Sequence, residues 1–329
     1  MRRLTLILSD LYLPDETAAG VVPQIDAMPE LEWLLRFAHA PVRVGDWRRW
    51  LLNQVGGQLV EIPLAVICGH EKVSGSALET AWLATPVALE ARLDHGRLVD
   101  RGLLYLQPSE CTVWCNEFNR VFAPQYQLHE LGERAFILSG LPHVAKPIAD
   151  PARLLGAEIG PALPGPEAPE LRRLWTEIEM WLHGSALNSE RERAGRHRVS
   201  AFWLWGRDAD PRGSRGTDER DLELYGGDPL ISGLSRMRQP QLRGAPKSLT
   251  QVDGSAHHVV AEFAALTGHP QESLPALDAH WFAAARQMLG SGALSSLDII
   301  ANDRRFRITP HAGWRFWRRQ RSWLENLAH

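Results

Sequence analysis

A short apolar run near the N-terminus is the feature that most constrains the fold. Leu4–Leu8 is almost entirely apolar and ends in the polar pair Ser9-Asp10. Runs of this length, bounded by polar residues, are typical of a buried strand. We therefore predict a buried first strand with Asp10 at its carboxyl end.

Other stretches have the spacing of amphipathic helices, with apolar side chains recurring every three or four positions. Pro29–Ala40 begins with a proline, which suits the first turn of a helix. In Asp46–Val55 the aspartate is a candidate N-cap, and the following Gly56-Gly57 pair predicts the end of the helix. Further helical patterns lie at Ser109–Phe122, Glu170–His183 and Leu277–Leu289.

Strand patterns surround one of these helices in the middle of the chain. They lie at Pro86–Arg92, Leu103–Leu106, Tyr126–His129 and Arg134–Ser139. Strands in this order around a helix suggest a small α+β layer of ferredoxin-like type.

The second half of the chain is less regular. Ser200–Trp205 is a strand pattern, and Leu297–Ile300 with Phe306–Ile308 predicts a hairpin that turns at Asn302-Asp303. Val259–Leu266 fits either a strand or a helix. The proline-rich Ile148–Glu170 predicts an ordered connector, and the charged Arg207–Arg220 predicts an exposed, mobile loop.

Composition limits the class of protein. The chain has 329 residues, enough for two domains or one large domain with an insertion. Its 44% hydrophobic and 23% charged residues are ordinary for a globular protein, and a net charge of −3 provides no global attraction to nucleic acid or membrane. Three cysteines without framework spacing, no signal-peptide pattern and no membrane-length apolar run predict a cytoplasmic protein with buried thiols.

Three blocks of sequence resemble a known bacterial family. The first is Trp82–Arg92, followed by Asn119 and Phe122. The second combines Glu177–His183 with Asn188, Arg191, Gly195 and the strand Trp203–Gly206. The third consists of Leu277–Phe282 and Trp314–Arg318. Together they resemble the phosphoglycerate-mutase-related proteins that include the regulator-of-pathogenicity-factors E type, over roughly residues 80–320. That family is distantly related to archaeal-type cofactor-independent phosphoglycerate mutases.

The resemblance implies an α/β fold with an alkaline-phosphatase-like core sheet flanked by helices. The core would comprise residues 1–80 and 150–329, and residues 81–149 would form the inserted α+β subdomain. The chain departs from the enzyme relatives at one turn, because Ser200 replaces an asparagine and Arg207-Asp208 replaces a glycine pair.

The resemblance also implies a chemistry that needs two divalent metals and a serine nucleophile, and therefore a cluster of Asp and His ligands. Asp10 follows the first strand, where such enzymes place a metal-binding aspartate, but it also fits a carboxylate that caps a turn. Asp253 and His257 have helical ligand spacing, and His269 follows the next apolar run. These four residues are the ones that a rearranged site for Mn²⁺ or Zn²⁺ would use. We expect no cofactor and no catalytic residue, and we interpret Ser74 and Ser76 as loop serines.

A ligand site is a separate hypothesis. Asn188 and Arg191 lie three residues apart at a helix end, and the pair suits an anionic or phosphorylated small molecule. Alternatively, Asn188 terminates the helix and Arg191 pairs with Glu179 or Glu192. The same face would include Glu177 and His183.

Three functions remain open at this level. The first is a non-catalytic, regulatory descendant of the mutases that binds an anionic small molecule or a protein. The second is a metal-dependent phosphatase or phosphomutase with a rearranged site. The third is a nucleic-acid-binding regulator that would use Arg304–Arg307 and Trp314–Trp323, where arginines alternate with aromatic residues. The acidic whole chain disfavours nucleic acid as a partner.

Overall fold

The computed structural model describes residues 2–12, 28–70, 72–91, 96–141, 147–207, 222–238, 246–252, 257–266, 273–310, 317–319 and 321–328. The chain forms two compact units. The first combines Met1–Leu59 with Gly213–His329, and the second is Val60–Arg212. Each unit has its own sheet and its own helices, which confirms the α/β class.

The first unit contains a six-stranded sheet in the order β2-β11-β10-β1-β9-β8. These strands are Val42–Arg43, Arg304–Ile308, Leu294–Ala301, Arg2–Leu8, His258–Phe263 and Leu222–Tyr225. The four strands from β10 to β8 are parallel, and β11 and β2 continue the sheet in antiparallel pairing. The apolar run at the N-terminus is therefore the strand between β10 and β9, and its last five residues are buried as predicted.

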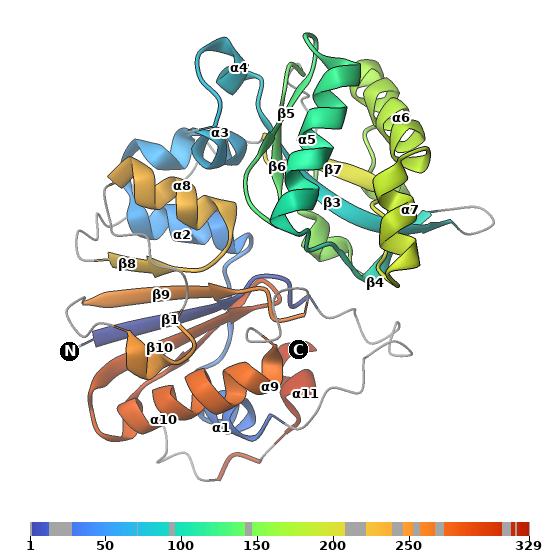
Figure 1. Ribbon diagram of the computed structural model, residues 1–329. Coiled ribbons are helices and arrows are strands. Elements are labelled where there is room, and N and C mark those ends of the chain that lie inside the picture. Colours follow the sequence, from blue (N-terminus) through green and yellow to red (C-terminus); the bar gives the residue numbers. More distant parts are fainter. Residues whose placement is uncertain are drawn as a thin grey trace. The chain divides into compact units, whose positions relative to one another are not determined.

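Helices cover both faces of this sheet (Figure 1). On one face lie α1 (Pro29–Phe37), α9 (Leu274–Leu277), α10 (Ala283–Gly290) and α11 (Trp323–Ala328), and on the other lie α2 (Trp47–Val55) and α8 (Pro229–Arg238). A π-helical turn, Asp278–Phe282, joins α9 to α10.

Local sequence signals explain several of these boundaries. Asp46 caps α2 by accepting the Arg48 main-chain N–H at 2.8 Å. At the tip of the β10–β11 hairpin, Asn302 and Asp303 adopt the positive φ angles of 47° and 60° that a two-residue turn requires.

The second unit contains an antiparallel sheet in the order β4-β3-β6-β5, with β7 also paired to β3. The strands are β3 (Trp82–Ala91), β4 (Gly96–Leu103), β5 (Gln127–Glu130), β6 (Phe136–Ser139) and β7 (Ala201–Trp205). The helices are α3 (Leu64–Gly69), α4 (Ser76–Glu79), α5 (Pro108–Phe122), α6 (Pro169–His183) and α7 (Ala186–Arg193). Trp114 on α5 packs edge-on against Trp181 on α6 and Phe202 on β7, which joins these helices to the sheet.

Several predictions from sequence are refined by the structure. Most of strand β9 lies in Val259–Leu266, and of the extended piece expected at Leu103–Leu106 only Leu103 is in a strand, as the last residue of β4. The connector Ile148–Glu170 contains two short 3-10 turns, Pro151–Leu154 and Gly160–Ala162. The second compact unit includes residues 60–80 and 150–212 as well as the predicted insert 81–149. Most of the predicted loop Arg207–Arg220 lies outside the described residues.

Two further expectations concern cysteines and membranes. Cys68, Cys111 and Cys115 form no disulfide and are buried, as the sequence predicted. Among the described helices, none combines the length and the apolar character that crossing a bilayer requires.

Candidate functional site

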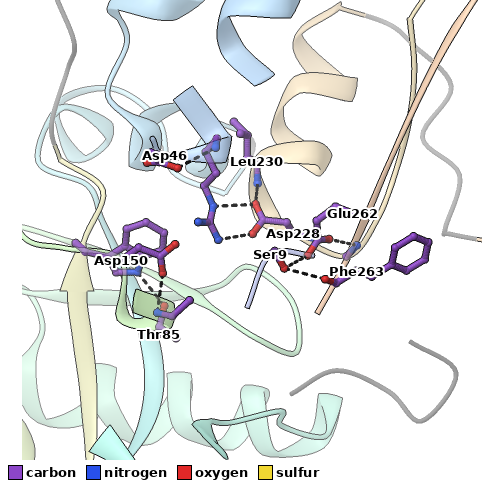
Figure 2. Close-up of polar contacts among 12 residues, drawn as sticks. Ser9, Asp46, Thr85, Asp150, Asp228, Leu230, Glu262 and Phe263 are labelled. Atoms are coloured by element: carbon purple, nitrogen blue, oxygen red, sulfur yellow. Dashed lines mark hydrogen bonds and ion pairs between the residues drawn. The ribbon is translucent and has the colours of Figure 1, made fainter. Parts of the chain in front are cut away.

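Polar side chains gather at one edge of the first unit's sheet. Strands β1, β9 and β8 are parallel neighbours, so their carboxyl ends meet at the same edge. Ser9 follows β1, Glu262 belongs to the end of β9, and Asp228 follows β8. All three are buried, and Glu262 is completely inaccessible. Figure 2 shows them converging on one small region.

Glu262 is the centre of this cluster. Ser9 Oγ donates to Glu262 Oε1 over 2.5 Å, and the main-chain N–H groups of Gly227 and Asp228 donate to Oε2 over 3.1 and 3.0 Å. Both carboxylate oxygens therefore already accept hydrogen bonds from the chain itself. The bonds to Gly227 and Asp228 also fix the turn that follows β8.

Arg48 neutralises the second acid of the cluster. Its Nη2 lies 2.7 Å from Asp228 Oδ2 and its Nε lies 3.4 Å from Oδ1. Asp228 Oδ1 also accepts the Leu230 N–H at 2.9 Å, at the start of α8. The side chains of Arg48 and Asp228 are 9% and 6% exposed. The charge of Asp228 is thus matched within the chain, by a guanidinium bound to both carboxylate oxygens.

Asp10 is close to this edge but far from its predicted partner His257. Asp10 is buried, and its Oδ2 accepts the Leu266 N–H at 2.9 Å. In the parallel pairing of β1 with β9, Arg3 is level with His258 and Leu8 with Phe263. His257 precedes the start of β9 and Asp10 follows the end of β1, so the two are separated by about 17 Å or more along the sheet.

One metal ion therefore cannot bind both Asp10 and His257. The other two residues of the rearranged site, Asp253 and His269, lie outside the described part of the chain. Within the described ranges, no group of three or more His, Cys, Asp or Glu side chains has a geometry that could hold a metal ion. Ser74 and Ser76, in the second unit, are both exposed.

Asn188, a predicted ligand residue, uses its side-chain amide for hydrogen bonds to the main chain. Its Nδ2 donates to the carbonyl oxygens of Leu182 and Val199 at 2.8 and 2.9 Å, and its Oδ1 accepts the Val199 N–H at 2.8 Å. The side chain is completely buried. Asn188 therefore fastens the end of α6 and the start of α7 to the segment that enters β7.

Arg191, the second predicted ligand residue, forms a buried ion pair within the second unit. Its Nη1 lies 2.8 Å from Glu110 Oε1, and its Nε donates to the His197 carbonyl at 2.8 Å. Glu110 in turn accepts the Gln107 N–H at the start of α5. The sequence had suggested Glu179 or Glu192 as the partner of Arg191, but the structure pairs it with Glu110. This contact joins α7 to α5 through two side chains that are 3% and 6% exposed.

The remaining predicted residues lie on the outer part of α6. Glu177 pairs with Arg173 one turn earlier, at 2.8 Å and largely in solvent. His183 is exposed, and its main-chain carbonyl accepts Arg198 Nη2 at 2.8 Å. His183 and Asn188 thus lie close together in the structure, whereas Glu177 instead pairs with Arg173.

His183 and Asn188 both line a pocket of about 440 Å³ in the second unit. Its volume is within the range of small-molecule sites. The pocket is formed by the end of β3, the start of β4, α6, α7 and the segment before β7. It is lined by Leu89, Glu90, Ala91, Gly96, Ile159, Glu179, His183, Asn188, Arg198, Val199 and Ser200.

Glu179 is the most informative group in the pocket. Burial raises the pKa of its carboxyl, and the neighbouring Trp175 side chain acts in the opposite direction. Among the described residues it forms no ion pair, whereas Arg198 lies 3.3 Å from Glu192 as well as bonding to the His183 carbonyl. From the sequence, Glu179 was expected only as a possible partner of Arg191, so its position in a pocket was not predicted.

The basic and aromatic C-terminal segment was the basis of the nucleic-acid hypothesis. Phe306 is buried on β11, and Arg307 forms two hydrogen bonds to Asp298 on β10, at 2.8 and 2.7 Å. Trp323 is buried as well. Two of the aromatic rings and one of the arginines of this segment therefore make contacts within the protein itself. Trp314 lies outside the described residues.

Comparisons with known proteins find only low similarity. No family model matches the chain, and a search of curated proteins finds no match. Among solved structures, the cofactor-independent phosphoglycerate mutase from Thermoplasma acidophilum has 16% identity and a TM-score of 0.39, covering 94% of this chain and 90% of its own. The PH0037 protein from Pyrococcus horikoshii has 11% identity and a TM-score of 0.45, covering 93% and 84%.

Proposed function

We propose that this chain is a non-catalytic relative of the cofactor-independent phosphoglycerate mutases, which binds a small molecule in the pocket beside α6 and α7 and acts as a regulatory protein. The sequence resemblance over roughly residues 80–320 supports the relationship. Four parallel strands with helices on both faces support an alkaline-phosphatase-like core. Leaving out β4 and α7, the chain order β3-α5-β5-β6-α6-β7 supports a ferredoxin-like subdomain.

The main support for the proposal that the chain is non-catalytic is the pairing of Arg48 with Asp228. Metal-dependent phosphoryl transfer needs carboxylates that are open to a cation. Here a guanidinium is bound to both oxygens of Asp228, and Glu262 accepts bonds from Ser9 and two main-chain N–H groups. A divalent ion at this edge would meet a fixed positive charge.

An activity and metal assay tests this part of the proposal. The purified chain is incubated with 3-phosphoglycerate and, separately, with p-nitrophenyl phosphate, each with Mn²⁺, Zn²⁺ or EDTA. We expect no turnover above the buffer rate. We also expect no rise in melting temperature with either metal, because an ion that binds only the folded chain would stabilise it. Turnover that is lost in Ser9→Ala and Asp10→Ala would overturn the proposal.

The ligand-binding part is tested at the pocket. Ala91 lines the pocket and is exposed at the end of β3, so Ala91→Trp fills the space without replacing a buried side chain. We expect small-molecule fragments that perturb amide resonances of Leu89, Val199 and Ser200 in the natural chain to lose this effect in Ala91→Trp.

A further inference from the structure

The pocket has an apolar wall made by four side chains. Leu89 and Ala91 come from β3, Ile159 lies in the connector Ile148–Glu170, and Val199 precedes β7. A compact apolar group of a ligand would be removed from water against this wall, which is the usual source of affinity in small pockets.

The uncharged polar side chains of the pocket are already satisfied by the main chain. Asn188 uses its amide on Leu182 and Val199. Ser200 Oγ accepts the Leu89 N–H at 3.0 Å and donates to the Leu89 carbonyl at 3.4 Å. The charged groups, and His183, therefore determine which polar end of a ligand the pocket accepts.

Those charges favour a cation. Glu179 is partly buried on α6 and has no ion-pair partner among the described residues. Arg198 is the basic residue of the lining, but its guanidinium is held by Glu192 and by the His183 carbonyl. A ligand carboxylate would have to compete with Glu192 for Arg198 while lying near Glu179.

We propose that the pocket binds a small molecule in which a protonated amine is attached to a compact apolar group, with the amine against Glu179 and the apolar group against Leu89, Ile159 and Val199. This inference rests on the proposed ligand-binding function of the same pocket. It differs from the anionic ligand expected from Asn188 and Arg191, because both of those side chains are occupied inside the fold.

The test compares three probes of one shape, benzylamine, benzyl alcohol and benzoate, titrated into the full chain and followed by amide chemical shifts. Because burial raises the pKa of Glu179, the titrations are made at pH 8, well above the ordinary carboxyl pKa, where benzylamine is protonated. We expect benzylamine to shift the resonances of Leu89, Val199 and Ser200 at concentrations at least about tenfold lower than the alcohol or the acid do.

Two variants on α6 test whether Glu179 causes the preference for benzylamine. Glu179→Gln keeps the shape and removes the charge, and we expect it to weaken benzylamine binding about tenfold and to leave benzyl alcohol unchanged. Glu177→Gln removes a carboxylate that pairs with Arg173 instead, so it should leave both probes unaffected. Melting curves of both variants confirm that they remain folded.

The outcomes separate the two proposals. If benzoate binds as tightly as benzylamine, or if Glu179→Gln does not weaken the amine, the ligand class is wrong and the pocket is still a binding site. If none of the three probes perturbs the pocket in the natural chain, and Ala91→Trp gives the same spectra with and without probe, the ligand class and the proposed binding function both fail.

Discussion

The guanidinium of Arg48 binds both carboxylate oxygens of Asp228, although the two residues are 180 positions apart in the chain. The pair joins the start of α2 to the turn between β8 and α8, where Asp228 also accepts the Leu230 N–H. Arg48 additionally lies over the Trp47 ring, with its guanidinium carbon 4.3 Å from the ring centroid.

Replacing Arg48 should therefore destabilise the first unit strongly. Arg48→Met keeps much of the side-chain volume but leaves the buried Asp228 carboxylate without its cation, and breaking such a pair costs about 3–5 kcal/mol. Urea denaturation followed by tryptophan fluorescence measures the change. Arg173→Met, at a largely exposed pair with Glu177, is the matched control and should give no measurable change.

Asn188→Ala should destabilise the second unit. It leaves the Leu182 and Val199 carbonyl oxygens and the Val199 N–H buried without their partner, at a cost of about 2–4 kcal/mol. Ser189→Ala, at an exposed position next to it, is the control. Equal stability of the two variants in urea would show that Asn188 does not fasten α7 as described.

The thiols of Cys111 and Cys115 should resist modification in the folded chain. Burial is the main cause that raises the pKa of each to about 12, and the nearby Glu130 adds to it. At pH 8 the reactive thiolate is then at least about a hundredfold scarcer than in the unfolded chain. Alkylation by iodoacetamide, read by mass spectrometry of the two sites before and after adding urea, measures the difference.

The same thiols should make the free energy of unfolding decrease at high pH. Because the folded pKa is raised, the folded chain holds these protons more tightly than the unfolded chain. Their contribution is complete below the ordinary thiol pKa of about 9 and is lost as pH rises toward about 12. Replacing both with alanine should flatten the fall in stability across that interval.

Gly226 should tolerate no side chain. Its φ is 145°, and a Cβ there would lie 2.7 Å from Glu262 Oε2 and 2.9 Å from Ile231 Cδ1. Gly226→Ala should cost about 2 kcal/mol or more, as strain and crowding add together. Gly45 also has a positive φ, of 65°, but has no neighbour within 4 Å, so Gly45→Ala should cost about 1 kcal/mol. Comparing their midpoints in urea measures the combined effect of crowding and of the more strained φ at Gly226.

Short sequence patterns correctly predicted the strand, the helix cap and the turn that depend on neighbouring residues. The apolar Leu4–Leu8, the Asp46 cap and the Asn302-Asp303 turn each depend on a few neighbouring residues, and the structure confirms them. Helix α8 was missed because glycine, serine and arginine interrupt its apolar spacing.

Contacts between distant segments could not be predicted in the same way. Ser9 and Glu262 are 253 positions apart, and Glu262 is recognisable in sequence only as an acid inside an apolar run. The partner of Arg191 proved to be Glu110, 81 positions away, rather than Glu179 or Glu192. Only the pairing of β1 with β9 and the packing of α5 against α7 bring these side chains together.

The position of β1 in its sheet has a consequence for biosynthesis. Its neighbours β9 and β10 begin at His258 and Leu294, so β1 leaves the ribosome well before either partner strand has been made. Residues 60–212, in contrast, are contiguous and can fold while translation continues. The apolar segment Leu4–Leu8 therefore lacks its native strand partners throughout that interval, during which an unpaired apolar strand is prone to aggregation.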